Sequence, residues 1–256
     1  MSRIQGAFEN GAAFIGFVTG GDPTIEATKE IILEMDRAGA DLIEIGVPFS
    51  DPIAEGIVIQ EANLRALAHR TTVDTLFDMV AELRRTTQVP LVFLTYLNPV
   101  FHYGYDSFFA RCKDVGIDGI IIPDLPFEEK GEVVSVADGY DVAVISLVAP
   151  TSEDRIRTIA SDARGFLYVV SSMGVTGVRS EIKTDLEAIV SAAKKVSPVP
   201  VAVGFGINTP AQAKEIGTYA DGVIVGSAIV KIIAEHGENA APYVADYVQQ
   251  MKAALE

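Results

Sequence analysis

Residues 41–56 read DLIEIGVPFSDPIAEG, and they combine a short apolar strand with a loop that contains two prolines. Apolar residues fill positions 42–46 apart from Glu44, and a second acid, Glu55, follows eleven positions later in the loop. Continuous apolar strands of this type are buried on both faces, which is typical of a parallel sheet covered by helices. The stretch therefore predicts a parallel-sheet fold that places one acidic side chain in apolar surroundings.

The same pattern, an apolar run followed by a helical segment, recurs along the whole chain. Strands are expected at residues 12–20, 41–46, 90–96, 118–124, 141–148, 165–170, 200–206 and 221–226. Helices are expected at residues 25–40, 57–69, 71–86, 105–116, 126–139, 152–163, 184–196, 209–220 and 227–237, with one more at the carboxyl terminus. About eight strand–helix units close a (β/α)8 TIM barrel. An open doubly wound sheet is the alternative fold for such a series.

Length and composition fit one α/β barrel. No linker, charge block or low-complexity segment divides the 256 residues, so residues 1–256 are expected to form a single TIM-barrel domain with extra helices. Apolar residues make up 49% of the chain, yet no apolar run approaches the roughly 18 residues that would span a bilayer. The first residues, MSRIQGAFEN, do not resemble a secretory signal. A soluble protein is predicted.

Charge and cysteine content exclude some classes of binding partner and favour one cellular compartment. The 35 acidic residues exceed the 20 basic ones, and the net charge of −15 repels nucleic acids and anionic membranes. The single cysteine, Cys112, excludes an internal disulfide framework and fits a cytoplasmic protein; on its predicted helix it is expected to be a packed structural thiol. The three histidines lack metal-ligand spacing, so no metal site is predicted.

In a TIM barrel the chemistry takes place at the carboxyl ends of the strands. The polar side chains expected at those ends are Thr19, Asp22, Glu44, Tyr96, Asn98, Asp124 and Tyr168. Glycine-containing turns follow the last three strands, at residues 171–177, 204–207 and 226–230. Glycine lets backbone N–H groups approach an anion, and the turn at Gly226 and Ser227 also opens a helix, whose N-terminus favours phosphate. Three such turns in succession predict a phosphate-binding site.

These motifs together resemble the α subunit family of tryptophan synthase. The stretch EIGVPFSDPIAEG looks like that family's signature. FVTGGDP, YLNPVFHYG, IPDLPFEE, LYVVSSMGVTG, VGFGI and VGSAIVKI follow the family's order over essentially the whole chain. Phosphate-binding turns occur in many barrel enzymes, whereas the GVPFSDP and GVTG loops together are specific to this family.

The resemblance implies that the chain cleaves indole-3-glycerol phosphate to indole and glyceraldehyde 3-phosphate by a retro-aldol reaction, in L-tryptophan biosynthesis. Such a cleavage needs a proton delivered to indole C3 and another removed from the neighbouring hydroxyl. Glu44 matches the family's catalytic glutamate, and its apolar neighbours would raise its pKa towards neutrality. Tyr168 matches a family tyrosine near the reacting glycerol.

The chain departs from the family at three positions. Glu55 stands where the family usually has an aspartate that accepts the indole N–H, so the carboxylate is retained one methylene further from the backbone. Ile57 replaces a more familiar proline, and Ser172 stands where the family often has arginine. A misplaced carboxylate oxygen lowers the reaction rate, because reactivity depends steeply on geometry. Glu55 is nevertheless expected to fill the second catalytic role.

The resemblance also implies which residues contact the indole ring and the phosphate of the substrate. The residues expected at the indole pocket are Phe17, Leu94, Tyr96, Ile121, Asp124 and Phe205. The residues expected to bind phosphate are Thr176, Gly177, Gly206, Gly226 and Ser227, and the loop that carries the first two is expected to close over the ligand. Core packing at strand ends explains each apolar residue of the indole pocket nearly as well, taken singly.

A partner is implied as well. The family's α subunit docks on a pyridoxal-phosphate-dependent β subunit in an α2β2-type complex and passes indole to it. The positions expected to contact the β subunit lie in predicted proline-containing loops; they are Ser50, Asp51, Pro52, Asn98, Pro99 and Pro126. The pyridoxal phosphate would belong to the partner, and no cofactor is predicted for this chain.

Two alternatives to the lyase remain. One is another phosphosugar barrel, such as an indole-glycerol-phosphate synthase or an aldolase, which would require a catalytic lysine at a strand end. The lysines of this chain fall in predicted helices or loops, which counts against that alternative. The other is a weakly catalytic or non-catalytic phosphate-binding subunit that mainly activates its β partner, since Glu55 and Ser172 both differ from the family pattern.

Overall fold

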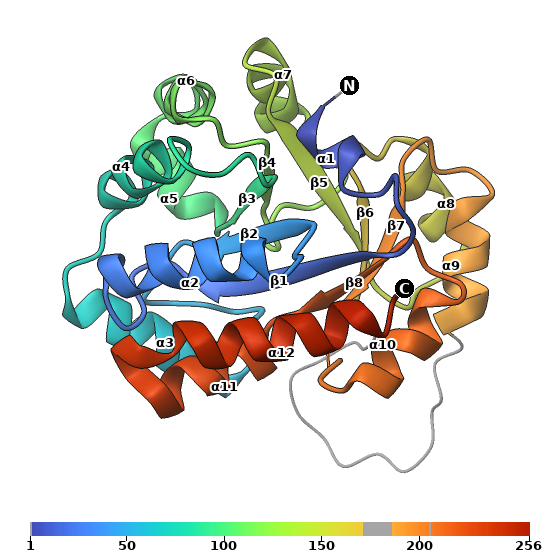
Figure 1. Cartoon of the computed structure of the whole chain (residues 1–256). Coiled ribbons are helices and arrows are strands. Elements are labelled where there is room, and N and C mark those ends of the chain that lie inside the picture. The colour runs from blue at the N-terminus through green and yellow to red at the C-terminus, as the bar shows by residue number, and fades with distance from the viewer. Residues whose placement is uncertain (1, 171–185, 205) are drawn as a thin grey trace.

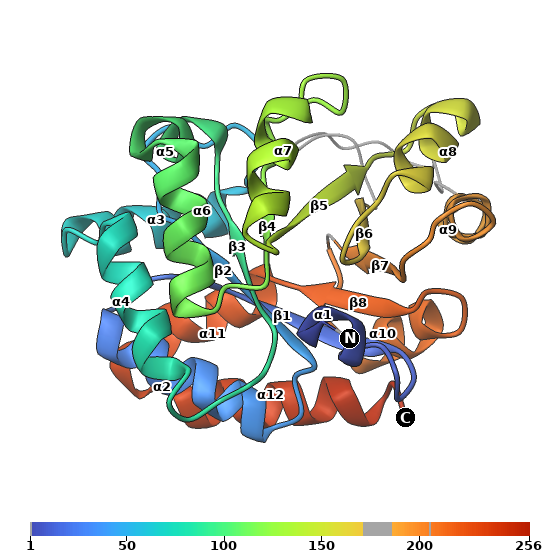
Figure 2. The same ribbon diagram turned by 90° about the horizontal axis from the view of Figure 1, so that it is seen from above.

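The computed structural model describes residues 2–170, 186–204 and 206–256. In these residues eight parallel strands pair in chain order, and β8 closes on β1 to complete a barrel (Figures 1 and 2). The strands are β1 (Ala13–Thr19), β2 (Leu42–Gly46), β3 (Leu91–Leu94), β4 (Gly119–Ile121), β5 (Ala143–Val148), β6 (Leu167–Val170), β7 (Val201–Gly204) and β8 (Gly222–Val225). The TIM barrel predicted from the sequence is confirmed, and the open sheet is excluded.

Helices surround the barrel within the described residues. They are α1 (Arg3–Gly6), α2 (Ile25–Arg37), α3 (Ile57–Ala68), α4 (Val73–Leu83), α5 (Leu97–Tyr103), α6 (Tyr105–Val115), α7 (Gly131–Gly139), α8 (Glu153–Ser161), α9 (Leu186–Lys194), α10 (Pro210–Gly217), α11 (Ser227–His236), the 3-10 helix Gly237–Asn239 and α12 (Ala241–Ala253). Side-chain oxygens of Thr24, Thr72 and Thr209 accept backbone N–H groups at the starts of α2, α4 and α10. These caps satisfy helix N–H groups that would otherwise lack partners.

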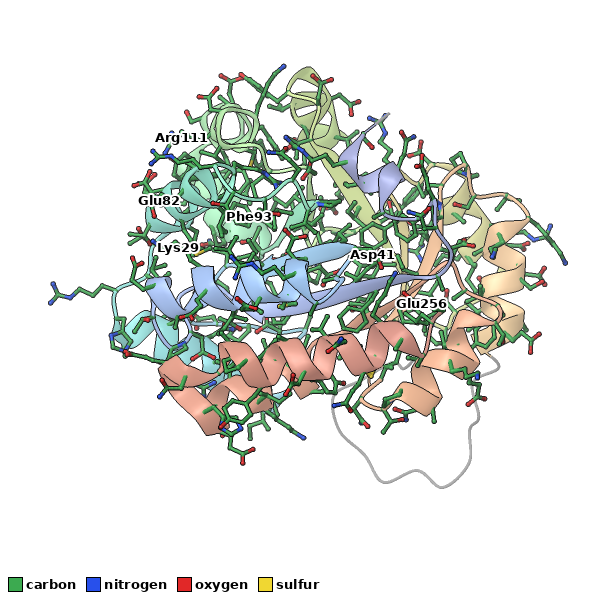
Figure 3. All side chains as sticks on the ribbon, viewed as in Figure 1. Lys29, Asp41, Glu82, Phe93, Arg111 and Glu256 are labelled. Carbon is green, nitrogen blue, oxygen red and sulfur yellow. The ribbon has the colours of Figure 1, made fainter. Side chains whose placement is uncertain are left out.

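Strand alternation divides the apolar residues between two cores. Inward-facing side chains such as Leu42, Val92 and Ile224 fill the barrel, and Ile4 of α1 packs with them. Outward-facing side chains such as Phe93 pack in the larger cluster shared by sheet and helices. Figure 3 shows Phe93 among these packed side chains. Because inward and outward positions alternate, Glu44 faces the barrel interior like Leu42 two residues before it.

Ion pairs join neighbouring helices at the protein surface. Lys29 on α2 lies 2.7 Å from a carboxylate oxygen of Glu82 on α4, near the periphery in Figure 3. No helix within the described ranges is long and apolar enough to cross a membrane. Cys112 is a free, buried thiol on α6, as predicted, and burial raises its pKa well above the usual value.

Two short helices were not predicted from the sequence, and one helix begins later than predicted. Helix α5 covers Asn98 and Pro99, which were interpreted as a loop; its first turn tolerates proline because that N–H needs no helical partner. Gly104, at φ 88°, separates α5 from α6. Helix α1 was not expected, and α7 begins at Gly131, five residues later than predicted, after a turn at residues 126–130.

Candidate active site

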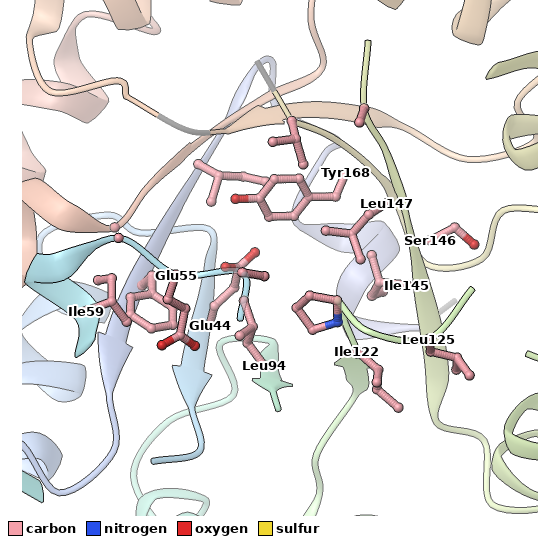
Figure 4. Close-up of a pocket in the computed structure, with 18 of the residues that line it drawn as sticks. Glu44, Glu55, Ile59, Leu94, Ile122, Leu125, Ile145, Ser146, Leu147 and Tyr168 are labelled. Carbon is pink, nitrogen blue, oxygen red and sulfur yellow. The ribbon is translucent and has the colours of Figure 1, made fainter. Parts of the chain in front are cut away.

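A cavity of about 730 Å³ opens at the carboxyl ends of the strands. It is continuous from the barrel mouth to the start of α11, and Figure 4 shows the side chains that surround its centre. Of the residues predicted to form the site, the ones that line this cavity are Phe17, Glu44, Glu55, Leu94, Pro126, Tyr168, Gly206, Gly226 and Ser227. Two carboxylates, an apolar wall and glycine-containing turns therefore share one cavity.

Glu44 is the most deeply buried acid of this cavity. It is the third of five residues in β2, so it lies within the strand rather than at its end, and its exposed fraction is 1%. One of its carboxylate oxygens, Oε1, has no hydrogen-bond partner among the described residues. Burial raises its pKa from 4.5 to about 8, because the ionised form loses its hydration. Glu44 is consequently protonated at neutral pH, with an unengaged oxygen in the cavity.

Tyr168 of β6 lies across the cavity from β2, and Figure 4 shows its ring beside Glu44. Burial, and then the charge of Glu44, raises the pKa of Tyr168 well above its usual value, so its hydroxyl stays neutral. The ring depends on a glycine for space, since a Cβ atom added to Gly204 would lie 2.4 Å from the Tyr168 hydroxyl oxygen. Gly204 on β7 therefore fixes where that hydroxyl can lie.

Glu55 is half-buried in the loop that precedes α3. The side-chain amide of Asn63 donates a hydrogen bond of 2.7 Å to Oε2 of Glu55. Burial raises the pKa of Glu55, and the Asn63 hydrogen bond opposes that increase by favouring the ionised form. Figure 4 shows Glu55 and Glu44 on the same side of the cavity. The two carboxyl groups therefore have contrasting environments within one site.

The apolar wall includes more residues than the sequence analysis identified. Phe17 and Leu94 were predicted; the additional apolar side chains at the barrel mouth are Ile59, Ile145, Leu147, Val170 and Ile224. Alternation along β5 places Ile145 and Leu147 on the inward face, so the strand period could have indicated them. Ile59 on α3 carried no such signal, because an apolar residue on an amphipathic helix is ordinarily core.

Three residues predicted for the indole pocket do not line the cavity. Tyr96 is buried, and its hydroxyl accepts a hydrogen bond from the Ala54 backbone N–H at 2.9 Å. Ile121 packs in the barrel core below the cavity. Asp124 accepts the Leu97 N–H at 2.9 Å and thereby stabilises the start of α5. Position at a strand end identified the correct edge of the sheet, whereas the direction of each side chain depended on the local turn.

The other polar residues predicted at the strand ends, Thr19, Asp22 and Asn98, do not line the cavity. Both carboxylate oxygens of Asp22 accept hydrogen bonds of 2.8 Å from the Arg65 guanidinium. That pair joins the loop after β1 to α3. Thr19 ends β1 with a buried hydroxyl that has no hydrogen-bond partner among the described residues, and Asn98 is exposed on α5.

The far end of the cavity offers backbone donors. Gly226 precedes α11 and Ser227 is its first residue, so the unpaired N–H groups of that helix start open toward the cavity. Gly206, at φ 85°, and Asn208 line the same end. The predicted contacts Thr176, Gly177 and Phe205 lie outside the described residues, as does Ser172.

The described lysines do not support a lysine-dependent aldolase. None of them lies on a strand. Lys130 and Lys231 line the cavity from the start of α7 and from α11, and Lys130 pairs with Asp162 at 2.9 Å. Within the described ranges, no group of three His, Cys, Asp or Glu side chains could hold a metal ion.

Three large apolar side chains are exposed in the β2–α3 segment and on α5. Ile53 and Ile57 flank Glu55 in the β2–α3 segment and are 75% and 71% exposed, while Phe101 on α5 is 68% exposed. Ser50 and Asp51 lie exposed in the same loop, and Pro52 is half-buried.

Comparison with known proteins gives consistent matches over the whole chain. Residues 5–256 match the family model of the tryptophan synthase alpha chain. The tryptophan synthase alpha chain of Lacticaseibacillus casei is 46% identical over 256 residues, covering 100% of this chain and 96% of the relative. That of Geobacillus stearothermophilus is 48% identical over 90% of this chain and 86% of the relative.

Solved structures agree with these sequence matches. The crystal structure of tryptophan synthase subunit alpha from Legionella pneumophila superposes with a TM-score of 0.90 at 36% identity, covering 100% of this chain and 98% of that one. A chain from the crystal structure of the tryptophan synthase complex of Pyrococcus furiosus gives 0.86 at 34% identity, covering 94% of this chain and 98% of that one. The chain therefore belongs to the tryptophan synthase alpha chain family, whose members are lyases that cleave indole-3-glycerol phosphate.

Proposed function

We propose that this chain cleaves indole-3-glycerol phosphate with Glu44 as the proton shuttle and Glu55 as the acceptor of the indole N–H. The observation that carries the proposal is Glu44: a fully buried carboxyl group with a pKa of about 8 and one oxygen that no described residue engages, in a cavity that holds a second carboxylate. A group with a pKa near the working pH can both give and take a proton. Family membership supports the substrate.

The reaction requires two proton transfers, one to indole C3 and one from the neighbouring hydroxyl. Protonated Glu44 delivers its proton to indole C3, and the positive charge that develops on the ring nitrogen is stabilised by the Glu55 carboxylate, which accepts the N–H. The Glu44 carboxylate then removes the proton from the neighbouring hydroxyl. The bond between C3 and the glycerol carbon breaks, its electron pair returns to the indole ring, and the hydroxyl carbon becomes the aldehyde. Glu44 ends protonated, so no net proton is consumed.

The remaining residues hold the substrate along the cavity. Phe17, Leu94 and the apolar residues of β5 and β8 suit a planar indole ring. The Tyr168 hydroxyl lies beside Glu44, where the glycerol hydroxyls would be. Backbone N–H groups at Gly206, Gly226 and Ser227 suit the phosphate. Thr176, Gly177 and Phe205 are assigned to the substrate by the family resemblance.

The chain is proposed to act with a tryptophan synthase β subunit. The Pyrococcus furiosus relatives include a tryptophan synthase a2b2 complex, which supports such a partner. The exposed loop at Ser50, Asp51 and Pro52, the start of α5 at Asn98 and Pro99, and Pro126 are the proposed contacts. They adjoin the cavity opening, which suits transfer of indole to the partner. Pyridoxal phosphate is assigned to the β subunit, and this chain is proposed to act without its own cofactor. We further propose that it acts in the cytoplasm and that residues 1–256 form one domain.

Indole release by the purified chain, with and without a β subunit, tests the proposal. Glu44→Gln should abolish release, because an amide cannot exchange the proton. Glu55→Asp should retain part of the activity, because the carboxylate is kept but its oxygens move, and the exposed Glu9→Gln should match the natural chain. If the natural chain releases no indole even with the partner, the lyase assignment is wrong, and the chain is better explained as a phosphate-binding subunit that activates its partner.

A further inference from the structure

Glu55 is held in place by a buried amide on the helix that follows its loop. Asn63 lies on α3 with an exposed fraction of 3%, and its Nδ2 donates to Oε2 of Glu55 at 2.7 Å. Asn63 follows Ile59 by four positions, so both side chains lie on the helix face that borders the cavity. The neighbours on that face, Ile59 and Ala62, are apolar and pack with Phe17. An amide in such surroundings is costly to bury unless it makes a hydrogen bond.

Two further hydrogen bonds restrain the backbone on either side of the carboxylate. The Ala54 N–H donates to the Tyr96 hydroxyl at 2.9 Å, and Gln60 donates to the backbone carbonyl of Glu55 at 2.8 Å. The carbonyl and carboxylate of Glu55 and the N–H of the preceding Ala54 are thus bonded to three different side chains. The loop around Glu55 is anchored, so the position of its carboxylate depends on these contacts.

Because the loop is anchored, the length of the Glu55 side chain affects where its carboxylate lies. Glutamate has one more rotatable bond than aspartate, and each rotamer points the carboxylate at a different place. A hydrogen bond from a buried donor selects one of these positions. Because Asn63 is neutral and donates to Oε2 alone, it does not neutralise the carboxylate, and Oε1 is left to accept a second donor.

We propose that Asn63 is a positioning residue for the cleavage reaction: its amide holds one oxygen of Glu55 so that the other faces the indole N–H of the substrate. This inference rests on the proposed function, since it assigns Glu55 the indole N–H. It goes beyond that function by naming the residue that allows a glutamate to serve at this position.

The test compares Asn63→Ala with the natural chain in the indole-release assay. Positioning acts in the transition state, so kcat should fall by about ten- to a hundredfold with little change in KM. Leu64→Ala is the matched control on the same helix, because Leu64 is 65% exposed and should leave turnover unchanged. Thermal unfolding of both variants establishes that the protein measured is folded.

A pH profile separates positioning from a structural role. The Asn63 hydrogen bond lowers the pKa of Glu55, so its loss should move the acidic limb of kcat/KM to higher pH. Glu44, with a pKa of about 8, and Tyr96, with a pKa of about 12, also titrate in this part of the site, but both are present in the natural chain and the variant. A variant that merely destabilised α3 would leave the limb in place.

A double-mutant cycle completes the test. If Asn63 acts through the Glu55 carboxylate, Asn63→Ala should cost nothing further in a Glu55→Ala background. An equal loss in both backgrounds, or an unmoved acidic limb, would overturn the inference while leaving the lyase function intact. Inactivity of the natural chain would instead refute the proposed function, and this inference with it.

Discussion

Replacing Glu44 with glutamine should make the protein more stable as well as inactive. The carboxyl group is 1% exposed, and Oε1 has no hydrogen-bond partner in the described residues. Its pKa is about 8 in the folded chain and 4.5 when hydrated. Between those values the folded state binds a proton that the unfolded state releases, so the free energy of unfolding falls as pH rises from about 4.5 to 8. Glutamine has the same shape and does not titrate.

The size of the effect follows from the two pKa values. Their difference, at about 1.36 kcal/mol per pKa unit, corresponds to ~5 kcal/mol when Glu44 is fully titrated in both states. Most of this free-energy difference develops within a pH range that unfolding experiments can cover. The advantage of Glu44→Gln over the natural chain should grow by about 2.5 kcal/mol between pH 5 and pH 7, and by about 3.5 kcal/mol between pH 5 and pH 8.

Urea unfolding of the two proteins at pH 5, 6, 7 and 8 measures this growth directly. Other titrating groups are shared by both proteins, so they cancel in the difference. Glu9→Gln, which changes an exposed glutamate, should show a difference that is nearly constant with pH. A constant difference for Glu44→Gln would refute the reasoning, because it would mean that Glu44 titrates alike in the folded and unfolded states.

Three further predictions concern the pH profile and two contacts outside the cavity. The kcat/KM for indole release should fall above about pH 8 as Glu44 ionises; activity that stays constant to pH 10 would contradict its role as the acid. Tyr96→Phe removes the acceptor for the Ala54 N–H and should lower kcat by about tenfold while the unfolding midpoint changes little; unchanged turnover would show that this bond does not position the loop. Arg65→Ala leaves the buried Asp22 carboxylate unpaired and should cost about 3 kcal/mol in urea unfolding, less when combined with Asp22→Asn; equal costs would exclude the charge as the cause.

The barrel could be predicted because buried parallel strands appear in a sequence as continuous apolar runs. Each of the eight runs became a strand, although β3 ends at Leu94 rather than Tyr96. Tyr96 leaves the strand to precede α5, a helix of seven residues that contains an Asn-Pro pair. A helix this short has little amphipathic pattern, and its start is stabilised by Asp124, 27 positions along the chain. Nothing local to residues 97–103 indicates that partner.

The site was predictable to the extent that its residues break local rules. Glu44 stands out because an acid in an apolar strand is exceptional, and the glycine turns stand out because several occur together. Ile59 follows the pattern of an amphipathic helix and therefore looks like core. Asn63 also gave no signal, since its role depends on a contact with Glu55 that forms only when the loop folds back onto α3.

Two glutamates can perform different tasks in one cavity because different groups surround their carboxyl groups. Glu44 has apolar neighbours and an oxygen with no partner among the described residues, so burial favours its neutral form and makes it a proton donor at neutral pH. Burial raises the pKa of the half-buried Glu55 as well, but the hydrogen bond from Asn63 opposes that increase by stabilising the ionised, accepting form. Separating the pKa values of two like acids is how a single site supplies both an acid and a base. On this reasoning the amide of Asn63 is as necessary to the division of labour as the apolar wall around Glu44, and removing either would bring the two carboxyl groups toward the same state.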